Sequence, residues 1–321
     1  MKIIRPSYEI LPRDGQRGDM ATIERAARVC YKSEDKICDG SAEQIVRRLI
    51  GSGHLSAIEH GAYAFEVSGK LLEIVSGSLR MIGEQLGDAP RITATCINSR
   101  CIVSGNCRAW RELTALASDF VAGAGIAVYF VPYIDKAYIG DLIDVTDCAI
   151  DDRVRPLTAD ELAEDSVSAL YHLRQTVRFV VDRGVSHEFV RHRVMSFSQE
   201  STRFCRYSDD RLGNEITVID PCFFARDDER YRLWKRQCMS AEAAYMQLIH
   251  MGAKPEEARD VLPTSVKTEM IVTGTLAQWG HFFELRARQT TGKAHPQAVE
   301  VALPLMQDMT DLFPAIGSIR W

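Results

Sequence analysis

The stretch RHRVMSFSQESTRF, residues 191–204, concentrates positive charge and hydroxyl groups in one short run. Four arginines and a histidine fall within sixteen residues: Arg191, His192, Arg193, Arg203 and Arg206. Like charges this close repel one another unless an anion lies among them. Arginine forks bind phosphate bidentately, and serine and threonine hydroxyls add neutral donors. The stretch therefore predicts a site for a phosphate-bearing ligand.

A simpler interpretation of the same stretch is a helix end whose arginines pair with nearby acids. The candidate acids are Glu188, Glu200, Asp209 and Asp210. Charge runs of this kind are often solvated surface features. The two interpretations differ in what neutralises the arginines: a ligand in the first, and the chain itself in the second.

The composition places this local charge on an ordinary globular chain. With 321 residues, 46% hydrophobic and 26% charged, the chain can bury a sizeable core. A formal net charge of -5 argues against a nucleic-acid binder. No run approaches the roughly eighteen apolar residues of a membrane span, so we expect no membrane segment. Nine cysteines without a CxxC pair favour a reduced, cytoplasmic setting and no metal site.

Periodic patterns predict more helices than strands. Helices are expected over 41–51, from 107 onward, and over 165–184, 240–251, 255–259, 276–287 and 295–312. Strands are expected over 60–69, 91–106 and 268–275. Ser186 is expected to cap a short helix that carries Glu188, Arg191 and His192. The irregular order favours an α+β fold in a single domain, 1–321, with an inserted segment at about 114–165.

The common catalytic frameworks are missing from the sequence. It contains no complete GxGxxG, Walker loop, HExxH or GxSxG motif. The segment GHLSAIEH, residues 53–60, is either a turn from helix to strand or a loop that hydrogen-bonds a polar ligand through His54, Ser56 and Glu59. Cys222 follows a proline, but no histidine lies close behind it to activate a thiol nucleophile.

Residues 191–203 resemble the R-H-R-x7-S signature of the flavin-dependent thymidylate synthases, with Ser201 as the serine and Arg203 two residues further on. Other landmarks of that family follow in order: AARVCYKS, GHLSAIEH, SGNCRAWRE, RGVSHEFVRHR, EEARDVLP, HFFELR and AHPQ. The resemblance implies a homotetramer of α+β subunits, each with a mixed or antiparallel sheet flanked by helices. It also implies FAD bound between subunits. The implied reaction methylates C5 of dUMP, with methylenetetrahydrofolate as carbon donor and a flavin hydride that NADPH supplies.

The resemblance also implies roles for individual residues. Those expected to bind FAD are His54, Ser56, Glu59, Arg191, His192, Arg193, Gln199, Thr275 and His281. Those expected to bind the nucleotide are Glu188, Arg191, Gln199, Glu200, Ser201, Thr202, Arg203, Arg259 and Arg286. Arg286 is expected at the uracil edge as the main catalytic residue, because a guanidinium stabilises charge that develops on the ring. Ser201 is expected to orient and polarise the substrate.

Three departures from the family pattern leave the substrate open. Glu188 stands where many members have Gln, and Thr275 and Ala277 stand where Asn and Arg are common near FAD, so one ionic contact is expected to be lost. The substrate could be UMP, giving 5-methyl-UMP for nucleoside natural products, because one 2'-hydroxyl separates the two nucleotides. Two functions of a different kind also stay open: a non-catalytic nucleotide-binding protein, and a folate-dependent methylase that uses Cys222 as its nucleophile.

Overall fold

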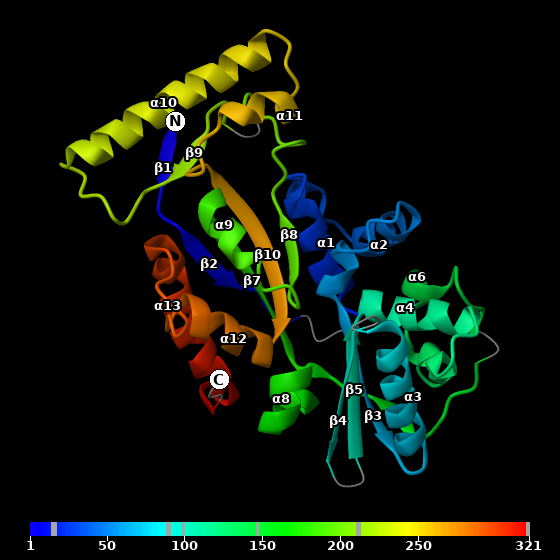
Figure 1. The fold of residues 1–321 in the computed structure, drawn as a ribbon. Helices are drawn as coiled ribbons and strands as arrows, with labels where there is room; N and C mark the ends of the chain where they lie inside the picture. Colours follow the sequence, from blue (N-terminus) through cyan, green and yellow to red (C-terminus); the bar gives the residue numbers. More distant parts are fainter. Residues whose placement is uncertain (14–17, 88–90, 98–99, 146–147, 210–212, 319–321) are drawn as a thin grey trace.

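A four-stranded antiparallel sheet forms the centre of the fold. The computed structural model describes residues 1–13, 18–87, 91–97, 100–145, 148–209 and 213–318. The strand order of the central sheet is β2 (Ser7–Ile10), β7 (Arg174–Asp182), β10 (Lys267–Thr275) and β8 (Ser196–Gln199). Every neighbouring pair in it is antiparallel. With helices on its faces (Figure 1), this arrangement confirms the α+β prediction.

Aromatic side chains form the core against the central sheet. The helices around it are α8 (Ser166–His172), α9 (Arg183–Phe189), α12 (Leu276–Arg286) and α13 (Pro296–Leu312). Phe179 of β7 packs on Phe189, Trp279 and Phe282, with ring centroids 5.1 to 6.2 Å apart. Because β7 and β10 are buried on both faces, their sequences do not alternate regularly between polar and apolar residues.

A second antiparallel sheet has a core of its own. Its order is β4 (Ile92–Ile97), β5 (Arg100–Asn106), β3 (Ala62–Ser68) and β6 (Val154–Pro156). The helices around it are α3 (Leu71–Leu86), α4 (Cys107–Ser118), α5 (Ala127–Phe130) and α6 (Lys136–Ile139). Phe65, Trp110 and Phe130 pack together at its centre. The first half of segment 114–165 therefore contributes to a packed core.

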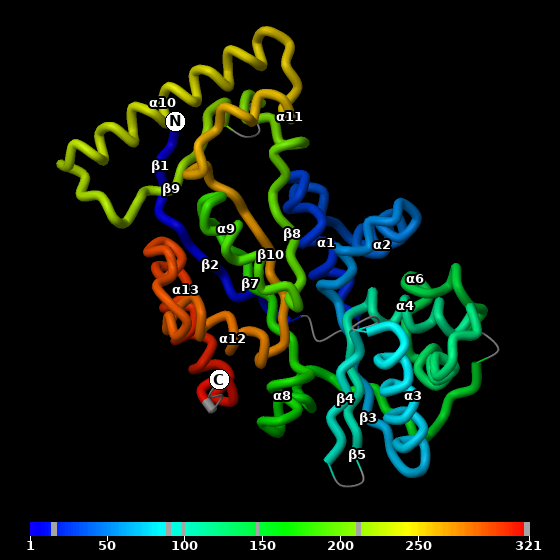
Figure 2. Tube along the Cα trace, in the orientation of Figure 1, coloured from blue at the N-terminus to red at the C-terminus, as the bar shows by residue number. Residues whose placement is uncertain are grey.

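The remaining elements lie around these two sheets, with the long helix α10 and the second sheet at opposite ends of the molecule (Figure 2). The helices are α1 (Met20–Val29), α2 (Ser41–Gly51), α7 (Ala159–Ala163), α10 (Glu229–His250) and α11 (Pro255–Ala258). The 3₁₀ turns are η1 (Glu34–Lys36), η2 (Ala57–His60), η3 (Ala124–Ile126), η4 (Val131–Tyr133), η7 (Arg259–Val261) and η8 (Pro314–Ser318). β1 (Lys2–Ile4) pairs in parallel with β9 (Thr217–Ile219). No helix in the described ranges is long and apolar enough to cross a membrane.

Three predictions from the sequence are wrong. The helix expected over 165–184 ends at His172, and β7 follows, since this segment pairs with β2 and β10 on both sides. Asp182 caps α9 by accepting from the Val185 N–H, whereas Ser186 lies inside the helix. The expected reduced state does not hold for every cysteine: Cys96 and Cys101 face each other across the β4–β5 pair and form a disulfide.

Candidate functional site

Arg286, the last residue of α12, meets the turn after α9 in a compact charged cluster. Its Nη1 donates to Glu188 Oε2 at 2.7 Å, and its Nη2 donates to the Glu188 carbonyl oxygen at 2.9 Å. Its Nε donates to His192 Nε2 at 3.3 Å. Burial lowers the pKa of Arg286, and the carboxylate of Glu188 opposes that shift. Arg286 therefore forms one cluster with two candidate residues, Glu188 and His192, from a segment almost a hundred positions earlier in the chain.

His192 is the most deeply buried member of this cluster. Its ring lies 5.0 Å from Phe282 and 5.6 Å from His281, measured between ring centroids. Burial, followed by the charge of Arg286, lowers the pKa of His192 to about 4, so its ring is neutral at physiological pH. Its Nδ1 is buried and has no hydrogen-bond partner among the described residues. The imidazole thus retains one free nitrogen beside the guanidinium.

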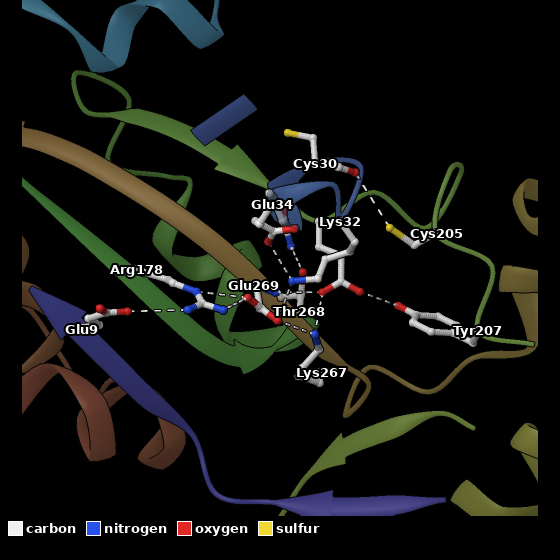
Figure 3. A network of polar contacts seen from close by, with 12 residues as sticks. Glu9, Cys30, Lys32, Glu34, Arg178, Cys205, Tyr207, Lys267, Thr268 and Glu269 are labelled. Atoms are coloured by element: carbon white, nitrogen blue, oxygen red, sulfur yellow. Dashed lines mark hydrogen bonds and ion pairs between the residues drawn. The ribbon is translucent and has the colours of Figure 1, made fainter. Parts of the chain in front are cut away.

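A buried charge network, part of which Figure 3 shows, includes Glu200 from the segment after β8. Lys267 lies 2.8 Å from both Glu200 Oε2 and Glu269 Oε1. Lys32 also contacts Glu269, at 2.9 Å, and Arg178 forms an ion pair with the same carboxylate. The carboxylate of Glu200 is therefore buried and paired with Lys267. This does not match its predicted contact with a nucleotide, although Gln199, Ser201 and Thr202 flank it.

These flanking residues have different surroundings. Gln199 donates to Ser186 Oγ at 2.8 Å and to Thr268 Oγ1 at 3.1 Å. Ser201 is half-buried, and its Oγ accepts from the Arg203 N–H at 3.2 Å. Thr202 is buried, and its Oγ1 accepts from Arg259 Nη1 at 3.5 Å. No contact among the described residues joins Ser201 to Arg286.

The arginines of the opening stretch are mostly exposed. Arg203 pairs with Glu256 at 3.2 Å, a partner that we did not predict, and Arg206 lies 3.7 Å from Asp209. Arg191 and Arg193 are exposed and form no ion pair within the described residues. Asp210 lies outside the described residues. Of the predicted pairings of these arginines with nearby acids, only Arg206–Asp209 is present among the described residues.

A cavity of about 500 Å³ lies between the second sheet and the adjoining ends of β7 and β10. Among the predicted residues, Glu59 and Thr275 line it. Glu59 is paired with Arg108 at 2.9 Å and accepts from Ser196 Oγ through its carbonyl oxygen at 3.2 Å. Val194, from the RHRV turn, also lines the cavity. His54 and Ser56 are exposed and do not line it, so the structure does not bring all the predicted flavin contacts together.

Three cavity residues were missed by sequence reasoning: His60, His172 and Arg174. His60 is buried, with Nδ1 2.8 Å from Thr273 Oγ1 and Nε2 3.0 Å from Ser198 Oγ. Burial lowers the pKa of His60 to about 3 and that of His172 to about 4. The adjacency of His60 to Glu59 was the only local signal. Nothing near His172 or Arg174 in the sequence indicated a cavity.

Two other predictions concern thiols and metals. Burial raises the pKa of Cys222 to about 11, with a smaller contribution from Glu300, so this thiol is protonated at neutral pH. A protonated thiol is a poor nucleophile, which weighs against the methylase that uses Cys222. The described residues contain no group of three or more histidine, cysteine or carboxylate side chains that could hold a metal ion.

Comparison with known proteins gives one family and several relatives. The model of the thymidylate synthase complementing protein family (Thy1) matches residues 14–72 and 147–315. A flavin-dependent thymidylate synthase from Pyrococcus furiosus is 32% identical over 139 residues, which cover 43% of this chain and 55% of the relative. Another from Corynebacterium aurimucosum is 31% identical over 166 residues, covering 47% and 62%. The chain thus spans little more than half the length of the curated relatives it matches.

Among solved structures, the UMP/dUMP methylase PolB from Streptomyces cacaoi, bound with 5-Br dUMP, aligns with 98% of this chain and 95% of that chain. The sequence identity is 17% and the TM-score is 0.41. This similarity is too distant to support an argument about the present chain.

Proposed function

This chain belongs to the thymidylate synthase complementing protein family, and from that premise we propose that it methylates C5 of dUMP reductively. In this proposal methylenetetrahydrofolate donates the carbon, and NADPH supplies reducing equivalents through FAD. The observation that carries the proposal is the cluster of Arg286 with Glu188 and His192. It joins the signature stretch to the arginine expected at the uracil edge.

The residues of the signature stretch fit a flavin. Arg191 and Arg193 are exposed cations with no ion pair in the described residues, and His192 Nδ1 is buried without a partner. The carbonyl oxygens and ring nitrogens of a flavin, together with its phosphates, offer hydrogen-bond partners for such groups. When bound, the flavin would supply the hydride. The basic side chains would then orient it and favour its anionic form.

Arg286 is suited to stabilise negative charge on a pyrimidine ring. Glu188 and the carbonyl oxygen of the same residue hold the guanidinium from one side, which reduces its freedom to rotate. A preorganised cation of this kind stabilises the negative charge that develops on the ring oxygens during reaction at C5 and C6. Since Glu188 engages Arg286 through Nη1, we expect the ion pair to set the orientation of the guanidinium.

We assign the nucleotide phosphate to the surface around Thr202. Arg259 Nη1 donates to Thr202 Oγ1, and the Arg203 backbone N–H donates to Ser201 Oγ, so two neighbouring hydroxyls lie with the Arg259 guanidinium beside one of them. Arginine and hydroxyl donors together suit a phosphate. Ser201 is proposed to orient the substrate and not to attack it, since none of its hydrogen bonds in the described structure involves a base.

We further propose that residues 1–321 act as one catalytic domain in a cytoplasmic homotetramer, with an insertion at about 114–165. The family model leaves residues 73–146 unmatched, which supports an added segment in this part of the chain. Light scattering on the protein as it elutes from a size-exclusion column measures the mass of the assembly. A mass of a single subunit of 36.0 kDa would contradict the tetramer.

The decisive experiment is to record the visible spectrum of the purified protein before and after NADPH, and then to assay methylation. Bleaching of a yellow chromophore followed by formation of dTMP, identified by mass spectrometry, is the expected result. UMP is offered in parallel, and methylation of UMP at the rate of dUMP would overturn the assignment of dUMP. A protein that is colourless and takes up no FAD would leave only a nucleotide-binding role.

A further inference from the structure

The cavity between the two sheets contains buried donors that the protein itself leaves unpaired. Arg13 Nη1, His172 Nε2 and Arg174 Nε are each buried without a hydrogen-bond partner among the described residues. All three residues line the same cavity. Buried polar groups are nearly always satisfied, so three such atoms around one space indicate a missing partner. We propose that this cavity binds an oxyanion, a phosphate or carboxylate group carried by an extended organic ligand.

Arg174 contributes most to this proposal. It is the first residue of β7, and its side chain forms no ion pair or hydrogen bond within the described part of the chain. Burial lowers its pKa, and the charge of Glu59 opposes that shift without forming an ion pair with Arg174 in the described structure. An unpaired charge in a protein interior destabilises the fold. A ligand that carries negative charge removes that cost.

His172 and Arg13 approach the same space from other elements. His172 is 3% exposed, and its Nδ1 lies 2.7 Å from Ser104 Oγ, which leaves Nε2 as a donor to the cavity when the serine hydroxyl donates to Nδ1. Arg13 lies over the ring of Phe313, with its guanidinium carbon 5.1 Å from the centroid. Neither contact neutralises a charge.

The charges around the cavity favour an anion over a cation. Three arginines line it, namely Arg13, Arg91 and Arg174, against two carboxylates, Asp19 and Glu59. Both carboxylates are already engaged: Glu59 pairs with Arg108, and Asp19 accepts from the Thr22 N–H. The positive charge is therefore in excess, and a volume of about 500 Å³ matches an organic ligand and not a single ion.

The identity of the ligand rests on the proposed function, which offers two sources of the oxyanion. One is the phosphates of the flavin cofactor, and the other is the carboxylates of the folate. Arg174 is the cross-strand partner of Thr275, a predicted flavin contact. Since Ala277 lacks the cation expected near FAD, we assign that role to Arg174, which lies opposite Thr275, two positions before Ala277. The shared chemistry is a charge-assisted hydrogen bond from guanidinium to oxyanion.

The test compares the wild-type protein with Arg174→Gln and with a control, Arg153→Gln. Arg153 directly precedes β6 of the second sheet, but it is exposed, pairs with Asp151 and does not line the cavity. Calorimetry measures the affinity for inorganic pyrophosphate and for 5-formyltetrahydrofolate, and flavin fluorescence measures the affinity for FAD. We expect Arg174→Gln to weaken pyrophosphate binding and one of the two organic ligands by about tenfold or more. The control should bind all three like the wild type.

The pattern of losses distinguishes the outcomes. Weaker FAD binding assigns the oxyanion to the cofactor, and weaker folate binding assigns it to the folate. A loss of pyrophosphate binding in a protein that binds neither FAD nor folate keeps the oxyanion site and refutes the proposed function. Unchanged affinity for pyrophosphate and both organic ligands overturns the inference while leaving the proposed function intact.

Stability supplies a second readout. Because Arg174 is unpaired, Arg174→Gln should melt at the same temperature as the ligand-free wild type or higher. A lower melting temperature with unchanged pyrophosphate affinity would make Arg174 structural and overturn the inference. If Arg174→Gln does not fold, Arg13→Gln replaces it in the same binding measurements. We expect Arg13→Gln to bind pyrophosphate about tenfold more weakly than the wild type, and unchanged affinity would overturn the inference.

Discussion

The proposed role of Arg286 leads to the most direct prediction about activity. Arg286→Ala removes the guanidinium and leaves Glu188 without its partner. We expect the rate of dUMP methylation to fall at least about a hundredfold, because a preorganised donor to developing charge is lost. Flavin binding should persist. Turnover assays on Arg288→Ala provide the control, since Arg288 pairs with Glu284 at the end of the same helix. Equal turnover in both variants would remove Arg286 from the catalytic role.

The buried His60 side chain should make the stability of the protein depend on pH. Its folded-state pKa of about 3 lies below the unfolded value of about 6.5, so stability is lost as pH falls through this window. Between pH 7 and 5 the free energy of unfolding should fall by roughly 2 kcal/mol through this group alone. Urea unfolding of His60→Gln should show a correspondingly smaller loss. From pH 8 to 7 the two proteins should change alike, and an unchanged loss below pH 7 in the variant contradicts the account.

At the residue scale, sequence reasoning named candidate positions but not the contacts between them. The hydrogen bonds that join Arg286 to Glu188 and His192 appear only in the folded structure, but the three residues themselves could be named as candidates from the sequence. His172 and Arg174 could not, because their importance arises from a cavity that residues of distant segments enclose. An unpaired donor is a property of the folded structure and leaves no pattern in the sequence.

At the scale of elements, residues 165–184 show why helical spacing misled. Leu170, Leu173, Val177 and Val180 fit a period near four, yet only the first of them lies in α8. A strand buried on both faces loses the alternation that would identify it. The β-branched run in β7 favours a strand, and pairing with β2 and β10 decides in its favour. Helices with polar faces, such as α4 and α12, were predicted correctly.

The junction between η2 and β3 supplies a prediction about packing. A Cβ at Gly61 would lie 2.1 Å from the Gly18 carbonyl oxygen and 2.8 Å from Ile23 Cδ1. Gly61→Ala should therefore destabilise the protein by about 2 kcal/mol or more, measured by urea unfolding. The same substitution at Gly77, inside α3 with no atom within 4 Å, should stabilise it by about 0.5–1 kcal/mol. Similar effects at the two glycines would refute the close contact.

At the scale of the whole molecule, polar contacts join parts that have separate cores. The cores around Phe65 and around Phe179 contain different buried residues. His60, in η2 next to the second sheet, forms hydrogen bonds with Ser198 of β8 and Thr273 of β10, and so connects that part of the chain to the central sheet. The sequence predicted most of the elements but not this arrangement, because the long-range contacts connect residues more than a hundred positions apart.

The ion-pair network around Lys267 connects the residues after α1 with β7, β10 and the segment after β8. We therefore expect it to contribute to the stability of the whole molecule. Burial alone would raise the pKa of Glu269, but Lys267 and Arg178 outweigh it and lower that pKa. The stability from this carboxylate is present above its unfolded pKa of about 4.3 and is lost as pH falls toward the lower folded value.

Lys267→Met leaves Glu200 and Glu269 in the interior with one cation fewer. Breaking a buried pair in this way should cost about 3–5 kcal/mol in urea unfolding at pH 7, and adding Glu200→Gln should recover part of it. Arg47→Met, which breaks an exposed helical pair with Glu43, should cost about 0.5 kcal/mol or less. A Lys267→Met protein as stable as the wild type would show that the carboxylates are neutral in the fold, and the network would then not hold the segment that leads to Ser201.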